Sequence, residues 1–189
     1  MHRNWHVAYL KMLALFVALV ALAENSSAAD RSRLDGLYAD LKESRSEVQA
    51  EATERKIWIE WLKHDEPVIT DMMTEALEQI RTNKLKLALA TLNQVVEEDP
   101  EYAEGWNSRA TVLYLLGAYD RSIGDIGRTL ALEPRHFGAM AGLGKILIKK
   151  GNLKRALQVY RRALKIHPYM VERNSVVPDL ERAVEGRGI

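Results

Sequence analysis

Hydrophobic and polar positions along residues 69–170 follow a helical spacing that repeats every 34 residues. Each repeat has an apolar stripe, a turn-type residue, a second apolar stripe and a proline. Eight positions recur in three successive units without an insertion: Met72, Trp106 and Met140; Ala76, Ala110 and Gly144; Asn83, Gly117 and Gly151; Leu85, Tyr119 and Leu153; Ala88, Ser122 and Ala156; Leu92, Ile126 and Tyr160; Val95, Thr129 and Ala163; Pro100, Pro134 and Pro168. A fixed period of this length predicts an array of similar structural units.

Each unit has the features of two helices joined by a tight turn. Trp106 and Ala110, like their counterparts, share one face of the first helix, where the small residue lets a neighbouring helix approach closely. Gly117 and its counterparts end that helix, because this position favours a residue that tolerates a positive φ. The second helix has an inner stripe at four-then-three spacing, and the proline at Pro134 cannot continue it. The chain is therefore predicted to be all-α.

These features resemble the tetratricopeptide repeat. The closest match is in the second unit, at Trp106, Ala110, Gly117, Tyr119 and Pro134. The resemblance implies an all-α, right-handed α-solenoid of three helix-turn-helix repeats with N-terminal capping helices. We expect the repeats at residues 69–102, 103–136 and 137–170, followed by a C-terminal capping helix and tail over residues 171–189.

Residues 30–66 have the apolar stripes of two further helices, but they fit the repeat poorly. Lys42 and Glu54 occupy positions that hold small residues in the repeats. We expect a capping pair whose Trp58 and Trp61 cover the exposed end of the first repeat, because terminal units of solenoids are commonly atypical. Two alternatives are open. The segment is a degenerate leading repeat, or its tryptophans form an anchor for a partner, since aromatic residues dominate binding hot spots.

Residues 1–29 have the pattern of a secretory signal peptide. A basic start precedes an apolar run over residues 12–23, and Ser27, Ala28 and Ala29 supply the small residues that a signal peptidase requires. The apolar run is shorter than the roughly 20 residues of a membrane-spanning helix. We expect cleavage, export to a bacterial periplasm and no stable membrane span afterwards. The alternative is an uncleaved segment that anchors the protein in the inner membrane.

Composition narrows the chemistry that the chain can perform. It contains no cysteine, which excludes disulfides and a thiol nucleophile, and its formal net charge of +1 gives no argument for nucleic-acid binding. His64, His136 and His167 lack the i, i+4 spacing of helical metal ligands. No set of residues has the pattern of a catalytic site, so we predict no enzyme activity, no metal site and no cofactor.

The resemblance implies a concave groove, lined by the first helices, that takes up a peptide or an extended segment of a partner protein. By register, the candidate groove residues are Met73, Leu77 and Ile80 from the first repeat, Asn107, Thr111 and Tyr114 from the second, and Ala141, Lys145, Ile148 and Lys149 from the third. Lys145 and Lys149 indicate an acidic or C-terminal carboxylate group on the partner. Alternatively, these lysines only keep the helix solvated.

We therefore predict a non-catalytic scaffold or adaptor that binds a partner protein in this groove. The alternative is a membrane-tethered assembly factor or accessory subunit that binds through the tryptophan-bearing helices or the convex face. The two-carboxylate clamp found in some members of this family is not predicted. Its positions hold Met73, Leu77, Ser108, Gly138 and Gly142 in this chain. The sequence carries no signal of the oligomeric state.

Overall fold

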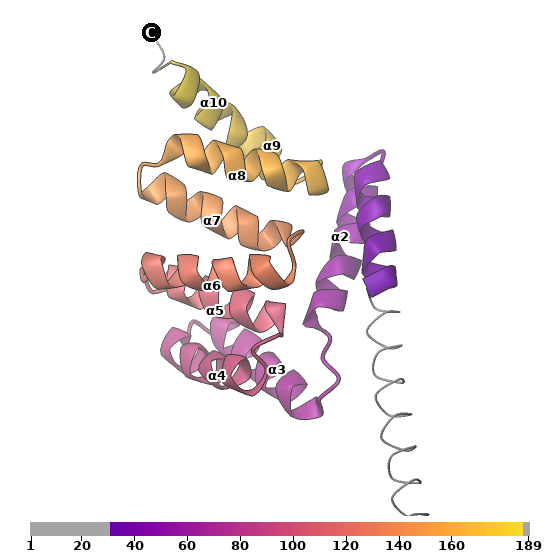
Figure 1. Ribbon diagram of the computed structural model, residues 1–189, viewed down its shortest axis with the longest axis vertical. Helices are drawn as coiled ribbons and strands as arrows, with labels where there is room; N and C mark the ends of the chain where they lie inside the picture. Colours follow the sequence, from indigo (N-terminus) through magenta and orange to yellow (C-terminus); the bar gives the residue numbers. More distant parts are fainter. Residues whose placement is uncertain (1–30, 187–189) are drawn as a thin grey trace, which may run out of the picture.

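Six helices form three antiparallel pairs that stack in one direction (Figure 1). The computed structural model describes residues 31–186, and the predicted signal peptide lies outside this range. The pairs are α3 (Pro67–Arg81) with α4 (Leu85–Glu98), α5 (Ala103–Leu115) with α6 (Tyr119–Leu132), and α7 (Phe137–Lys149) with α8 (Leu153–Ile166). The described residues contain helices and no strand, which confirms the predicted all-α solenoid. No helix in residues 31–186 combines the length and the apolar character that a membrane crossing requires.

The turn within each repeat has the backbone conformation that the sequence predicts. Asn83, Gly117 and Gly151 have φ values of 57°, 76° and 72°. The residue after each of them donates its backbone N–H to a carbonyl five residues earlier, as Ala118 does to Leu113 at 2.8 Å. These bonds satisfy carbonyl groups at the end of the first helix, so the second helix of each pair turns back in a fixed direction.

The inner stripes of the second helices form the core of the stack. Leu92, Ile126 and Tyr160, which occupy the same position in the three repeats, are 0%, 3% and 0% exposed. Gly144 lies directly against Tyr160, because a Cβ on this glycine would come within 2.5 Å of the Tyr160 ring. The small-residue position of the first helix is therefore required for close contact with the second.

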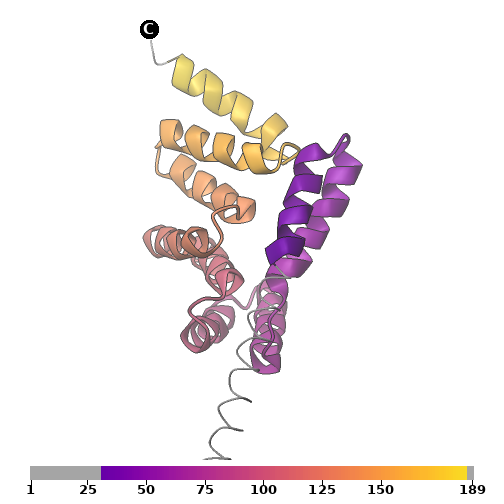
Figure 2. The same ribbon diagram turned by 45° about the vertical axis from the view of Figure 1, so that its right-hand side comes forward.

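An N-terminal hairpin lies across the ends of the repeat helices, beside the loops that join one repeat to the next (Figures 1 and 2). It consists of a helix over residues 31–43 and of α2 (Glu47–Leu62). Ser46 caps the start of α2, since its hydroxyl oxygen accepts a hydrogen bond from Gln49 N at 3.2 Å. The hairpin thus runs along the stack of repeats and does not extend it.

Side chains join the hairpin to three successive loops between repeat helices. After the first repeat, the Tyr102 hydroxyl donates to the carbonyl oxygen of the last residue of α2 at 3.1 Å. After the second, Trp61 stacks on His136 with ring centroids 3.8 Å apart. After the third, His167 Nε2 lies 3.1 Å from Glu54 Oε2. The hairpin therefore contacts the whole length of the repeat array.

The tryptophans of α2 lie in a different place from the one that we expected. Trp61 is 7% exposed, and Trp58 packs edge-on against Phe137 at the start of the third repeat. The expectation that they cover the exposed end of the first repeat is wrong, because α2 runs along the inter-repeat loops and not over the end of the stack. Burial of Trp61 also removes it as a free anchor for a partner.

Two short helices cover the third repeat at the other end of the chain. They are α9 (Glu172–Ser175) and α10 (Val177–Glu185). Val177 and Leu180 are buried in the same core cluster as residues of α8, and Arg161 of α8 forms an ion pair with Glu181 of α10 at 2.7 Å. This contact closes the apolar face that the last repeat would otherwise expose.

Candidate partner-binding groove

A hollow of about 610 Å³, which includes space open to solvent, lies between α5 and α7. Four of the predicted groove residues line it: Asn107, Thr111, Tyr114 and Lys145. The rest of the lining consists of Ala110, Leu115, Ser122, Ile126, Gly138, Ala139, Gly142 and Ile146. We call this hollow the groove. It combines aliphatic side chains with hydrogen-bonding groups, as sites that orient a bound ligand commonly do.

A buried carboxylate holds the polar wall of the groove in place. Glu104 is 4% exposed and accepts hydrogen bonds from Asn107 Nδ2 and Ser108 Oγ, both at 3.0 Å. His136 Nδ1 accepts from Ala139 N at 3.1 Å, so Nε2 carries the ring hydrogen and donates to Glu104 at 3.0 Å. These bonds fix the Asn107 amide. Its Oδ1 accepts no hydrogen bond from the described residues and is available to a ligand donor.

The two candidate lysines differ in their surroundings. Lys145 Nζ lies 3.7 Å from Glu172 Oε1, and the lysine side chain is 53% exposed. Lys149 Nζ lies 5.9 Å from the centroid of the Tyr114 ring, which is the outer limit of a cation–π contact. An anionic ligand group would therefore compete with Glu172 at Lys145, whereas Lys149 forms no salt bridge with the described residues.

A second hollow, of about 790 Å³ including open space, adjoins the groove at Gly138 and Lys145. The residues that line it come from α2, α7, α9 and the loop before α9: Glu51, Glu54, Trp58, Phe137, Gly138, Ala141, Lys145, His167, Tyr169, Met170, Val171 and Glu172. Three of these side chains are carboxylates. The surface therefore changes from polar and basic in the groove to acidic beside α2.

Glu54 is held in its ionised form at this acidic end. The hydrogen bond from His167 holds the pKa of the Glu54 carboxyl below its usual value, while burial opposes this change. The Trp58 indole N–H, which donates to Glu54 Oε1 at 3.1 Å, also lowers the pKa. The carboxylate thus joins α2 to the third repeat through its hydrogen bond with His167, while the bond from Trp58 lies within α2.

The structure divides the remaining predicted residues between core and surface. Met73 is 2% exposed and packs in the core of the first repeat, so its assignment to the groove is wrong. Ile80 and Ile148 are only partly buried but pack against core clusters. Leu77 is 39% exposed, although it does not line the groove. In the first repeat, Met73 is therefore enclosed by the core, and Leu77, four residues later, is the side chain that faces solvent.

The position of α2 in the site could not be predicted from the register. Glu54 occupies a small-residue position of a poorly matching unit, and no sequence pattern places Glu51, Glu54 and Trp58 beside the third repeat. A signal does exist at Gly142, whose small size leaves space next to the lysine of the groove, whereas the space beside Gly138 is filled by the Trp58 ring.

Each histidine in the described part of the chain forms one hydrogen bond with a carboxylate. His64 Nε2 lies 2.8 Å from Asp99 Oδ2 at the end of the first repeat, and each of the other two histidines described above has one glutamate partner. Among residues 31–186, no group of three or more His, Cys, Asp or Glu side chains is placed to hold a metal ion. These histidines join elements of the fold.

Comparison with known proteins gives one family. The tetratricopeptide repeat family model matches residues 73–131 and 120–171. A TPR repeat-containing protein of Rhizobium etli is 36% identical over 144 residues, which cover 76% of this chain and 71% of that protein. DnaJ homolog subfamily C member 3 of Mus musculus is 26% identical over 106 residues, but the match covers only 21% of its length and 56% of this chain.

Solved structures with the same fold include two complexes with peptides. The first TPR of Spaghetti (RPAP3), bound to an HSP90 peptide, has a TM-score of 0.59 and 17% identity, with 62% of this chain and 93% of that chain covered. The Yersinia enterocolitica type III secretion chaperone SycD, in complex with a peptide of the translocator YopD, has a TM-score of 0.59 and 14% identity, with coverage of 66% and 98%. At 17% and 14% sequence identity, the similarity shows a shared fold and nothing more specific.

Proposed function

Because the chain belongs to the tetratricopeptide repeat family, we propose that it is a non-catalytic scaffold that binds an extended segment of a partner protein in the groove. The family is generally a protein-interaction fold without catalytic activity. The two peptide complexes described above support the proposal by analogy of fold. The observation that carries it is the groove itself, in which residues of two neighbouring first helices surround one hollow.

The groove offers an extended segment both hydrogen bonds and apolar contact. Asn107 Oδ1 can accept a hydrogen bond from a backbone N–H, and Tyr114 and Ile126 offer apolar surface nearby. The amide is already fixed by Glu104, so binding orders little of the protein, and affinity gains from that preorganisation.

We expect an acidic residue or a C-terminal carboxylate on the partner segment at the lysine end of the groove. Lys149 has no carboxylate partner among the described residues. The salt bridge between Lys145 Nζ and Glu172 Oε1 is long, at 3.7 Å. A carboxylate at hydrogen-bond distance would offer Lys145 a closer partner than Glu172 does.

Site-specific crosslinking tests this proposal and identifies the partner segment. A full-length protein with the photoreactive residue p-benzoylphenylalanine in place of Thr111, which lines the groove, is irradiated in its native cells. Replacement of the exposed Glu97 on α4 is the matched control. The crosslinked partner segment is identified by mass spectrometry and synthesised, and its dissociation constant is measured by calorimetry. We expect crosslinks from the groove position that the control position does not form.

Groove variants then decide whether the segment binds as proposed. Tyr114→Ala removes a ring that lines the groove, and Lys149→Gln removes the charge beside that ring, so each is expected to weaken binding about tenfold. Lys165→Gln, which removes one exposed charge from α8, is expected to leave the dissociation constant unchanged. Equal binding by all three variants, with folding verified by circular dichroism, would contradict the groove assignment.

We also propose that residues 1–29 direct the protein to the periplasm. The support is the sequence pattern, in which a short apolar run precedes small residues at Ala28 and Ala29. Alkaline phosphatase, which is active only after export, fused behind residue 189 tests this. Activity with a shortened mature protein supports cleavage, activity with an unshortened membrane-bound protein supports the anchor, and lack of activity contradicts export.

A further inference from the structure

The turns within the repeats form one edge of the molecule with a local excess of basic side chains. Residues 82–87, 116–121 and 150–155 are equivalent in the 34-residue register and contain one acidic residue, Asp120. They contain six basic residues, which are Lys84, Lys86, Arg121, Lys150, Lys154 and Arg155. The formal net charge of the whole chain is only +1, so the excess belongs to this part of the surface. We call these three segments the basic edge.

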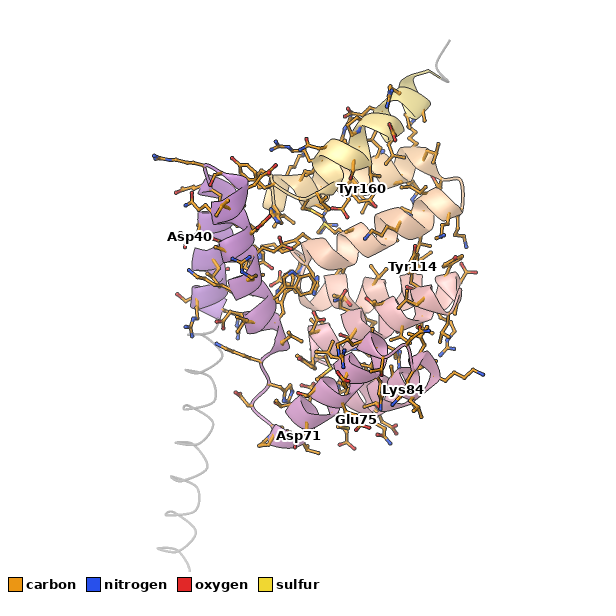
Figure 3. The ribbon with its side chains drawn as sticks, turned by 180° about the vertical axis from the view of Figure 1, so that it is seen from behind. Asp40, Asp71, Glu75, Lys84, Tyr114 and Tyr160 are labelled. Carbon is orange, nitrogen blue, oxygen red and sulfur yellow. The ribbon has the colours of Figure 1, made fainter. Side chains whose placement is uncertain are left out.

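The basic edge lies on the opposite side of the repeats from the hairpin. Figure 3 shows Lys84 at one border of the molecule and Asp40, in the helix over residues 31–43, at the other. The loops on the hairpin side are those at residues 97–102, 131–136 and 165–170. Together they contain five acidic residues and only two lysines or arginines. This separation of charge gives the stack one edge that attracts anions.

Five of the six basic side chains of this edge form no salt bridge with the described residues, and Lys84 interacts with Glu78 only at longer range. Lys150 forms an ion pair with Asp120. Lys84, Lys86 and Arg121 form no salt bridge with the described residues, and the same is true of Lys154 and Arg155. Their charge is therefore available to an external anionic surface.

Exposed leucines accompany these charges. Leu87, Leu115 and Leu116 are 56%, 50% and 39% exposed, which is unusual for three large aliphatic side chains on one edge. Leu87 and Leu116 share a shallow hollow of about 720 Å³, including open space, with Lys84 and Lys86. These leucines project from turns and helix ends, so they can enter an apolar phase without movement of the backbone.

We propose that the basic edge docks on the surface of an anionic lipid bilayer. Leu87 and Leu116 enter the interfacial region, while Lys84 and Lys86 contact lipid phosphates at the same depth. The observed combination fits this surface because a bilayer offers both anionic headgroups and an apolar interior. A nucleic acid or a highly acidic protein segment matches the charge but offers the leucines no comparable apolar phase. The groove opens between α5 and α7 and includes Leu115, but Leu87, Leu116, Lys84 and Lys86 do not line it, so this proposal does not depend on the proposed function.

A label on the edge of the full-length protein tests the proposal. The apolar run over residues 12–23 can bring the chain to vesicles by itself, so the readout must come from the edge. The chain has no cysteine, so Asn152→Cys places a single nitrobenzoxadiazole fluorophore on the third turn of the edge. Ala39→Cys on the hairpin is the control position. Each protein is titrated with phosphatidylcholine vesicles, with and without phosphatidylglycerol.

We expect fluorescence at Asn152→Cys to rise with vesicles that contain phosphatidylglycerol and to stay low with phosphatidylcholine alone. Each basic residue near an anionic surface contributes about 1 kcal/mol to membrane binding. The double variant Lys84→Gln with Lys86→Gln should therefore have a roughly 30-fold lower affinity for these vesicles. Leu87→Ser with Leu116→Ser should lower this affinity about tenfold or more. Lys165→Gln, outside the edge, should leave the affinity unchanged.

Three results would overturn the proposal. One is an equal response of the edge and hairpin labels, since orientation by the edge would then be absent. Another is a response at the edge that neither double variant reduces. A third is a response to soluble polyglutamate, reduced by the lysine variants, without one to phosphatidylglycerol vesicles, because this would assign the edge to an acidic protein. Failure of lipid docking leaves the crosslinking test of the groove unaffected.

Discussion

Two glycines of α7 show how position within one helix decides what a side chain can do. A Cβ on Gly144 would lie 2.5 Å from the ring of Tyr160, which is fully buried, whereas a Cβ on Gly142 would meet only Ile126 Cδ1 at 3.7 Å. Both positions are helical, so each substitution by alanine would gain up to about 1 kcal/mol in helix propensity. Only the surroundings distinguish them.

We expect Gly144→Ala to lower the free energy of unfolding by about 1–3 kcal/mol, because the new methyl group overpacks against the Tyr160 ring. Gly142→Ala is the matched control and should be neutral or stabilising by up to about 1 kcal/mol. Urea denaturation followed by circular dichroism measures both. If the two variants were equally stable, the close contact between α7 and α8 would not be rigid.

The carboxylate of Glu54 makes the stability of the protein depend on pH. Because hydrogen bonding lowers its pKa in the folded state, Glu54 stabilises the fold above the unfolded value of 4.5, and this contribution is lost as the pH falls through the folded pKa. Glu54→Gln should therefore lower the free energy of unfolding by about 1.5 kcal/mol near neutral pH, with a smaller difference in acid. Denaturation at a series of pH values measures this difference.

The neighbouring Glu51→Gln serves as the control for Glu54. Glu51 lies one turn earlier on α2, and its side chain is 67% exposed and faces only the exposed Arg55 at 4.0 Å. We expect little effect on stability at any pH from this change. The stability difference between Glu54→Gln and the unchanged protein should shrink in acid. If this difference in the free energy of unfolding stayed constant as the pH fell, the ionised form of Glu54 would not be what stabilises α2.

At the scale of elements, α2 holds the repeat array together through Trp61. The indole stacks on His136 and contacts Phe137 with ring centroids 4.9 Å apart. We expect Trp61→Ala to lower the free energy of unfolding by about 3–5 kcal/mol, as for other buried tryptophans. Hydrogen exchange should also become faster throughout residues 31–62, because the hairpin loses its contact with the loop between α6 and α7.

Two companion variants separate this contact from the propensity of the helix. Trp61→Phe retains an aromatic ring beside Phe137. It should cost less than the alanine variant. Ile59→Ala changes a side chain of α2 that is 57% exposed and should have little effect. If Ile59→Ala and Trp61→Ala increased exchange equally, the stacking contact would not be what holds the hairpin.

At the scale of the whole molecule, the sequence predicts whatever is repeated and does not predict what joins distant segments. The turns at Asn83, Gly117 and Gly151 follow from local backbone requirements that recur every 34 residues, and the structure confirms them. The docking of Trp61 could not be predicted in the same way, because its partners lie about 75 residues later and occupy no periodic pattern. Long-range contacts of this kind depend on three-dimensional shape.

For the candidate site, too, the repeated positions were predictable and the local packing around them was not. Four residues of α5 and α7 that the register selected line one hollow, but the register could not tell which face of the first repeat is covered. Met73 shares its register position with Asn107 and Ala141, and all three are less than 9% exposed. Asn107 still lines the groove because the space beside it is empty, whereas Met73 is enclosed by the first-repeat core. Spacing identifies equivalent positions, and local packing decides which remain accessible.

The hairpin that lies across the inter-repeat loops also fixes how many repeats the protein can have. An ordinary solenoid can gain or lose a unit, because each repeat contacts only its neighbours. Here Glu54 and His167 are 113 residues apart, and Asp35 and Arg135 are 100 residues apart, yet each pair is in contact. An inserted or deleted unit would separate one or both pairs. The hairpin, which is synthesised before the repeats, must therefore remain unpaired until the third repeat is made, and the array folds as a closed unit of defined length.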